Sequence, residues 1–168
     1  LGPIDHGCCL PPWWCLSEAI FDAWLPWPQL KTEPSDFAIE IVKRAVEKLP
    51  QTCKRLRETG LEESAITTLR LCTKLVDIGV VELGCNIRDI AMLMLRDEDK
   101  EPQELSWLEE RVMTAAAAAG APCTLQVTKR GDPEMVVENP DALQVEVFLQ
   151  TLAAAYRQDL SERSPGGR

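Results

Sequence analysis

Apolar residues recur along this chain at intervals of three and four, the spacing that places them on one face of a helix. Prolines and glycines interrupt the pattern and mark where a helix is expected to end, as Pro50, Gly60 and Gly79 do. Ser35 precedes one periodic stretch and is a typical N-cap residue. The pattern predicts six or seven helices, over residues 13–25, 36–49, 51–59, 62–78, 80–96, 102–119 and 140–161.

The segment 80–96 differs from the others because apolar residues lie on nearly every side of it. A helix that is apolar all round is typical of a protein interior. We therefore expect 80–96 to form the central helix, with the other helices packed around it.

Residues 123–138 break the helical period. Two short β-prone stretches, 124–128 and 134–138, flank a turn that contains Gly131 and Pro133, and they predict a β-hairpin. The predicted fold class is therefore mainly α, a six- to seven-helix bundle or a short α-solenoid with one β-hairpin before the last helix.

We expect three regions along the chain. Residues 1–34 form a Trp- and Pro-rich N-terminal segment with a short helix, and residues 35–162 form a helical domain that includes the hairpin. Residues 163–168 are expected to be a disordered tail.

Composition narrows the classes of function. The chain has 168 residues, 45% of them hydrophobic, which is enough for one substantial core. Its net charge of -9 repels nucleic-acid phosphates, so binding to nucleic acid through a broad basic surface is not expected. A run of cations from Lys43 to Arg57 is interleaved with glutamates and is interpreted as a solvated helix face. No apolar stretch reaches the length of a membrane span, and a membrane is not an expected partner.

The seven cysteines favour a reducing compartment. Their odd number would leave one unpaired in a closed disulfide framework, and Cys53, Cys72 and Cys85 fall in helical patterns where a thiol behaves as a small hydrophobic side chain. The chain also has no Asn-X-Ser/Thr site. We therefore predict an intracellular location, in the cytoplasm or the nucleus. The start at Leu1 is interpreted as that of a trimmed domain or a mature product.

The N-terminal segment is the strongest functional candidate, because four of the five tryptophans fall within the first 27 residues. Tryptophan is a favoured anchor both in cores and in interfaces, so the segment either docks on the chain's own helices or binds a partner. The remaining helices have apolar stripes of their own, and we expect loss of the segment to affect partner binding more than folding. The candidate partner-binding residues are Trp13, Trp14, Ile20, Phe21, Trp24 and Trp27.

The sequence offers few residues that could act as catalysts or as metal ligands. Zinc takes four ligands, yet Cys8 and Cys9 are adjacent, Cys15 stands apart, and no second cluster exists. His6 is the chain's single histidine, which removes most acid–base and Cys–His schemes. We therefore expect no catalytic residue, no metal and no cofactor.

Lys31 lies in a possible modification motif. Leu30-Lys31-Thr32-Glu33 matches the apolar-Lys-x-Glu pattern that a SUMO-conjugating enzyme recognises, although so short a pattern is also common by chance.

Together these features favour a non-catalytic adaptor or scaffold domain of a larger intracellular protein or complex. Its partner would be another protein, a subunit of the same complex. The alternatives are a secreted helical-bundle ligand of the cytokine type, which predicts paired cysteines, and a thiol-dependent enzyme that uses Cys8, Cys9 or Cys15.

Overall fold

The computed structural model describes residues 10–15, 25–95, 104–129, 131 and 133–163. Within these residues the chain is mainly helical, with five α-helices and one antiparallel hairpin. The helices are α1 (Asp36–Glu58), α2 (Glu63–Val76), α3 (Ile87–Met92), α4 (Trp107–Ala118) and α5 (Val145–Arg163), and the strands are β1 (Cys123–Val127) and β2 (Pro133–Val137).

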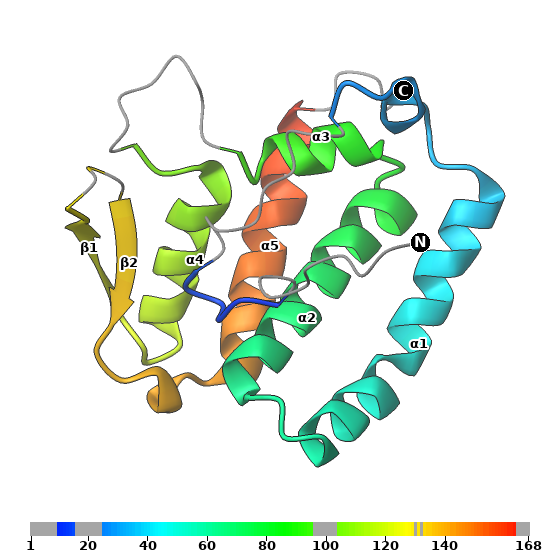
Figure 1. The fold of residues 1–168 in the computed structure, drawn as a ribbon. Coiled ribbons are helices and arrows are strands. Elements are labelled where there is room, and N and C mark those ends of the chain that lie inside the picture. The colour runs from blue at the N-terminus through cyan, green and yellow to red at the C-terminus, as the bar shows by residue number, and fades with distance from the viewer. Residues whose placement is uncertain (1–9, 16–24, 96–103, 130, 132, 164–168) are drawn as a thin grey trace.

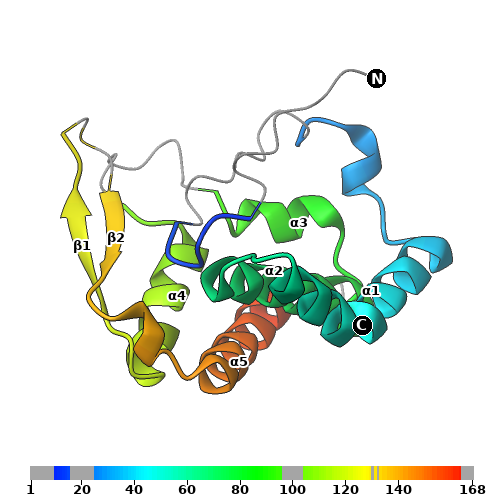
Figure 2. The ribbon, with the colours of Figure 1, turned by 60° about the horizontal axis from the view of Figure 1, so that its bottom comes forward.

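The elements stand in a row. Figure 1 shows the hairpin at one end, followed by α4, α5 and α2, with α1 at the other end, and Figure 2 shows the same order from a second direction. Helix α2 packs against both α1 and α5, and α4 packs against α5 and β1. The mainly helical class and the hairpin before the last helix are confirmed, but the predicted six or seven helices are too many for the part of the chain described.

One reason is that α1 continues through Pro50, where the sequence predicts a break. Ser35 caps the helix as predicted, accepting a hydrogen bond from the backbone N–H of Ala38, and the helix ends only at Glu58. Pro50 is exposed, and the inward-facing residues keep helical phase on both sides of it. These residues are Val42, Val46, Leu49, Cys53 and Leu56. Packing of this stripe on α2 offsets the backbone hydrogen bond that a proline lacks.

The predicted central helix over 80–96 is also wrong. Helix α2 passes directly into a π-helical turn, η3 (Asp77–Glu82). Gly79 therefore does not end the helical backbone, whereas the sequence predicts a break there. The break comes at Gly84, whose φ of 67° suits glycine, and Asn86 then caps the short helix α3. The segment is nevertheless buried at several points, including Val80, Ile90 and Leu93. Its apolar residues are therefore buried from two elements, the η3 turn and the short helix α3, and not from one long helix.

Gly79 permits a close approach at this bend. A Cβ atom placed there would lie 2.5 Å from Cδ1 of Ile90 and 3.2 Å from the hydroxyl of Tyr156. The absence of a side chain thus allows η3 to pack directly on α3 and α5.

Helix α5 occupies the middle of the row. Its buried side chains face η3, α2 and α4 and include Phe148, Leu152, Tyr156 and Leu160. The alanine-rich helix α4 packs beside it through small side chains, with Ala115, Ala116 and Ala119 fully or almost fully buried. Helix α4 begins at Trp107, later than the predicted start at Pro102, because Ser106 and Glu109 form a capping box.

The hairpin matches its predicted position closely. Strands β1 and β2 pair in antiparallel register from Cys123 opposite Val137 to Val127 opposite Pro133. Met135 of β2 is buried in the core, whereas most of β1 is exposed.

The N-terminal segment docks on the helices at residues 10–15. Trp13 is 1% exposed, and its ring centroid lies 5.2 Å from that of Phe148 in α5. Nearby, the buried hydroxyl of Thr68 in α2 donates a hydrogen bond of 2.7 Å to the carbonyl of Pro11. For Trp13, therefore, the self-docked alternative holds. The predicted helix over 13–25 falls mostly outside the described residues, and Trp13 and Trp14 lie in a turn.

We predict that Trp13→Ala lowers the free energy of unfolding by about 3–5 kcal/mol, because it opens a cavity beside Phe148. The matched control is Trp27→Ala, since Trp27 is 59% exposed and its loss is expected to change stability by no more than about 0.5 kcal/mol. Urea unfolding followed by circular dichroism measures both. Similar midpoints for the two variants would show that Trp13 does not belong to the core.

Tyr156 generates a second prediction. Its side chain is buried, and its hydroxyl has no hydrogen-bond partner among the described residues. Burial raises the pKa of this hydroxyl, with a further contribution from Cys85, so it stays protonated. Tyr156→Phe removes an unsatisfied polar group and is expected to raise the free energy of unfolding by about 1–2 kcal/mol in the same assay. A clear loss of stability would reveal a partner for the hydroxyl.

Candidate functional site

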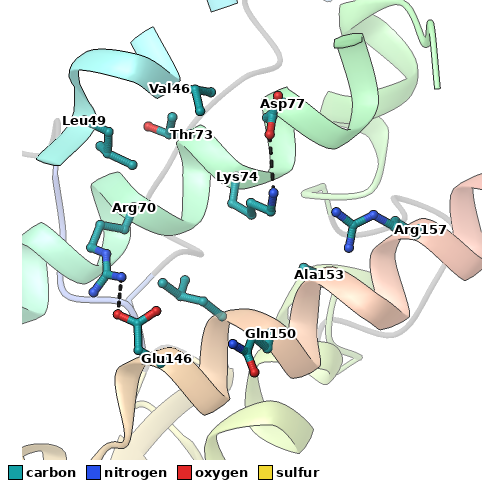
Figure 3. Close-up of a pocket in the computed structure, with 11 residues that line it drawn as sticks. Val46, Leu49, Arg70, Thr73, Lys74, Asp77, Glu146, Gln150, Ala153 and Arg157 are labelled. Carbon is teal, nitrogen blue, oxygen red and sulfur yellow. Dashed lines mark hydrogen bonds and ion pairs between the residues drawn. The ribbon is translucent and has the colours of Figure 1, made fainter. Parts of the chain in front are cut away.

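A groove of about 500 Å³ runs between α1, α2 and α5. Figure 3 shows its lining, which comes from all three helices and from the start of η3. The lining residues are Val46, Leu49, Arg70, Thr73, Lys74, Asp77, Glu146, Leu149, Gln150, Ala153 and Arg157. Its volume lies in the range of ordinary binding pockets.

The groove exists because α2 packs against α1 on one side and α5 on the other. Val46 and Leu49 of α1 supply one apolar wall, and Leu149 and Ala153 of α5 supply the other. Leu149 and Ala153 are buried, while Val46 and Leu49 are half-buried. The walls therefore offer apolar surface that a ligand or a polypeptide could cover.

Charged side chains from α2 and α5 reach across the groove and pair. Nη2 of Arg70 lies 2.5 Å from Oε1 of Glu146, which is 76 positions away in the sequence (Figure 3). This pair ties α2 to α5 at the rim. Nζ of Lys74 lies 3.3 Å from Oδ2 of Asp77 and 3.9 Å from Oε1 of Glu82, so it pairs within α2 and the η3 turn that follows it.

Arg157 makes the best-defined pair. Its Nε and Nη2 donate hydrogen bonds of 2.6 and 2.7 Å to the two carboxylate oxygens of Glu82. This hydrogen bonding lowers the pKa of Glu82, and the charges of Arg157 and Lys74 lower it further. The same hydrogen bond raises the pKa of Arg157. Since the pKa of Glu82 is lowered, the pair stabilises the fold above the carboxyl's ordinary pKa and is lost as the pH falls through the lowered value.

The walls of the groove are thus apolar, and the cations that line it are paired with carboxylates of the same chain. Each of Arg70, Lys74 and Arg157 already has a carboxylate partner, so none is a free positive charge for an anion. Such a surface suits a mainly apolar partner whose polar groups meet a rim of ion pairs.

Three of the described thiols have a raised pKa. Burial raises the pKa of Cys72, Cys85 and Cys123, and a nearby carboxylate, Asp89, adds to the effect at Cys85. A raised pKa disfavours the thiolate that a nucleophile needs. Of the three cysteines named for a thiol-dependent enzyme, Cys8 and Cys9 lie outside the described residues and Cys15 is half-buried. In the described ranges, no three His, Cys, Asp or Glu side chains are grouped as a metal site would require.

The structure separates the predicted partner-binding residues. Trp13 is in the core, and Trp14 is half-buried with its ring edge-on to Trp13, at a centroid distance of 5.2 Å. Trp27 is exposed at the start of the short 3-10 helix η2 (Pro28–Lys31), and Lys31 is exposed at its end. The other three candidates, Ile20, Phe21 and Trp24, lie outside the described residues. Of the predicted site residues that the structure describes, namely Trp13, Trp14, Trp27 and Lys31, none lines the groove.

No family model matches the chain, and no solved structure matches it significantly. The chain is similar to three phosphatidylinositol 4-kinases of Arabidopsis thaliana. Phosphatidylinositol 4-kinase gamma 1 is 33% identical over 118 residues, which cover 70% of this chain and 20% of that protein. Phosphatidylinositol 4-kinase gamma 8 is 26% identical over 182 aligned positions, covering 98% of this chain and 33% of that protein. Phosphatidylinositol 4-kinase gamma 6 is 30% identical over 111 residues, covering 63% of this chain and 17% of that protein.

The chain therefore spans a third or less of the length of the curated relatives it matches. Across the described residues, no helix is long and apolar enough to cross a membrane.

We predict that Arg157→Ala returns the pKa of Glu82 toward its ordinary value, because it removes the hydrogen bonds that lower it most. Lys74→Ala is the control and is expected to move the same pKa less, since Lys74 acts only through its charge at 3.9 Å. An NMR pH titration of the Glu82 carboxyl measures both shifts. A larger rise in the lysine variant than in the arginine variant would contradict the assignment.

Proposed function

We propose that the chain is a non-catalytic helical part of a larger phosphatidylinositol 4-kinase-like protein, in which it binds other parts of the same protein or complex. The observation that carries this proposal is the match to phosphatidylinositol 4-kinase gamma 8, which covers 98% of this chain but 33% of that protein. A match of this kind is expected when an entire structural unit recurs inside a longer chain.

The groove between α1, α2 and α5 is the surface that we assign to this contact. Its apolar walls favour a polypeptide partner, and its paired cations disfavour a free anion as the ligand. The exposed side chain of Gln150 on α5 lines the groove and offers a position for testing it.

The test is a chimera in which this chain replaces the matching segment of phosphatidylinositol 4-kinase gamma 8. We expect the chimera to transfer phosphate from labelled ATP to phosphatidylinositol in vesicles, whereas the isolated chain does not. Gln150→Trp in the chimera is expected to lower the rate about fivefold or more, as the indole occupies space that the partner needs.

The matched control is Gln158→Trp, at an exposed glutamine of α5 that does not line the groove. It is expected to leave the rate unchanged. A folded chimera without activity would contradict the proposed function, and equal losses in the two variants would exclude the groove as the contact surface.

A further inference from the structure

Helix α1 differs in charge and burial from the rest of the chain. It carries six cations and four carboxylates, a net charge of +2, within a chain whose net charge is -9. All six cations are exposed, and Cys53 is its single buried residue. The helix lies at one end of the row of elements in both Figure 1 and Figure 2, so one side of it faces away from the core.

The outward side of α1 has an ordered pattern that we call the α1 stripe. It comprises Phe37, Ile41, Arg44, Lys48 and Arg55, spaced four, three, four and seven residues apart. At 3.6 residues per turn these positions fall within an arc of about 60°. All five are exposed, on a side of the helix away from the inward residues that pack on α2. No carboxylate lies within this arc, and the three glutamates of α1 lie together along one side of it.

The stripe is apolar at one end and basic at the other. Phe37 is 75% exposed and Ile41 is 50% exposed, which is unusual for large apolar side chains and leaves both available for contact. Lys48 and Arg55 have no ion-pair partner among the described residues, while Arg44 pairs with Glu40 in the helical i,i+4 relation. The free cations contrast with those of the groove, which are all paired.

We infer that the α1 stripe binds the anionic surface of a phospholipid bilayer, with α1 lying along the interface. Exposed apolar residues together with cations on one helix face are the pattern of an interfacial helix. Lysine and arginine near an anionic leaflet gain electrostatic attraction, and the long side chains can reach lipid phosphates. The inference rests on the proposed function for the presence of a membrane nearby, and it revises the expectation that a membrane is not a partner.

A flat surface fits the stripe better than an acidic protein does. The five residues extend along about 27 Å of a straight helix, and they form a ridge at the edge of the molecule. The groove that could accept a protein lies on the opposite side of α1. A bilayer needs no recess to meet such a ridge.

The experiment is co-sedimentation of the full chain with vesicles of phosphatidylcholine alone or with roughly one third phosphatidylserine. We expect sedimentation that depends on phosphatidylserine and weakens as salt is raised. Lys48→Glu with Arg55→Glu is expected to weaken binding about tenfold or more. Phe37→Ser with Ile41→Ser is expected to weaken it also, because the apolar contact is lost. All four residues are exposed, and circular dichroism confirms that each variant is folded.

The matched control is Lys43→Glu with Lys54→Glu. These lysines are exposed on the same helix but lie off the stripe, so the change in net charge is identical. A much smaller loss in the control supports the inference. Equal losses in the two charge variants would overturn it in favour of general attraction, and binding that ignores phosphatidylserine, or no binding at all, would overturn it as well. The vesicles contain neither phosphatidylinositol nor ATP, so this outcome is independent of phosphate transfer by the chimera.

Discussion

Burial of α5 is the packing interaction on which the other elements depend. Phe148, Leu152 and Tyr156 are each no more than 1% exposed, and they meet different neighbours along the length of the helix. Trp13 contacts Phe148, and Trp107 of α4 lies 5.6 Å from Tyr156. The position of α5 therefore determines where the N-terminal segment, α2 and α4 can lie.

Small side chains make this arrangement possible on two sides of α5. The alanines of α4 keep that helix thin where it faces α5, and Gly79 lets η3 approach Tyr156. Trp107 and Arg111 of α4 are then held by one carboxylate of α5, since both donate hydrogen bonds to Oδ2 of Asp159 at 2.6 and 2.8 Å. The guanidinium of Arg111 also lies over the Trp107 ring at 5.7 Å. Small side chains thus allow α4 and η3 to pack closely on α5, and the hydrogen bonds to Asp159 fix how α4 is positioned along α5.

The sequence predicts those features that depend on neighbours in the chain. Helical periodicity locates α1, α2 and α5, and turn residues locate the hairpin, because each signal is local. It fails at Pro50 and in the segment 80–96, where tertiary packing overrides a local breaker or a local pattern. The capping box at Ser106 was available as a local signal and would have placed the start of α4 correctly.

The candidate site could not be predicted in the same way. Arg70 meets Glu146 and Arg157 meets Glu82 across 76 and 75 positions, so nothing in the spacing of these residues connects them. Trp13 illustrates a second difficulty, because a buried anchor and an interface anchor require the same side chain. The composition shows that the segment is aromatic. Only the fold shows that Trp13 packs against Phe148 in the core and that Trp27 is exposed.

The two proposed surfaces lie on opposite sides of α1. Val46 and Leu49 face the groove, whereas Arg44 and Lys48, interleaved with them in the sequence, belong to the outward stripe. A polypeptide in the groove and a bilayer on the stripe would therefore not compete for space. Both would act on one helix that buries a single residue, Cys53, in the core of the chain. Contacts on its two sides would then add to the packing that already holds α1 against α2 and η3.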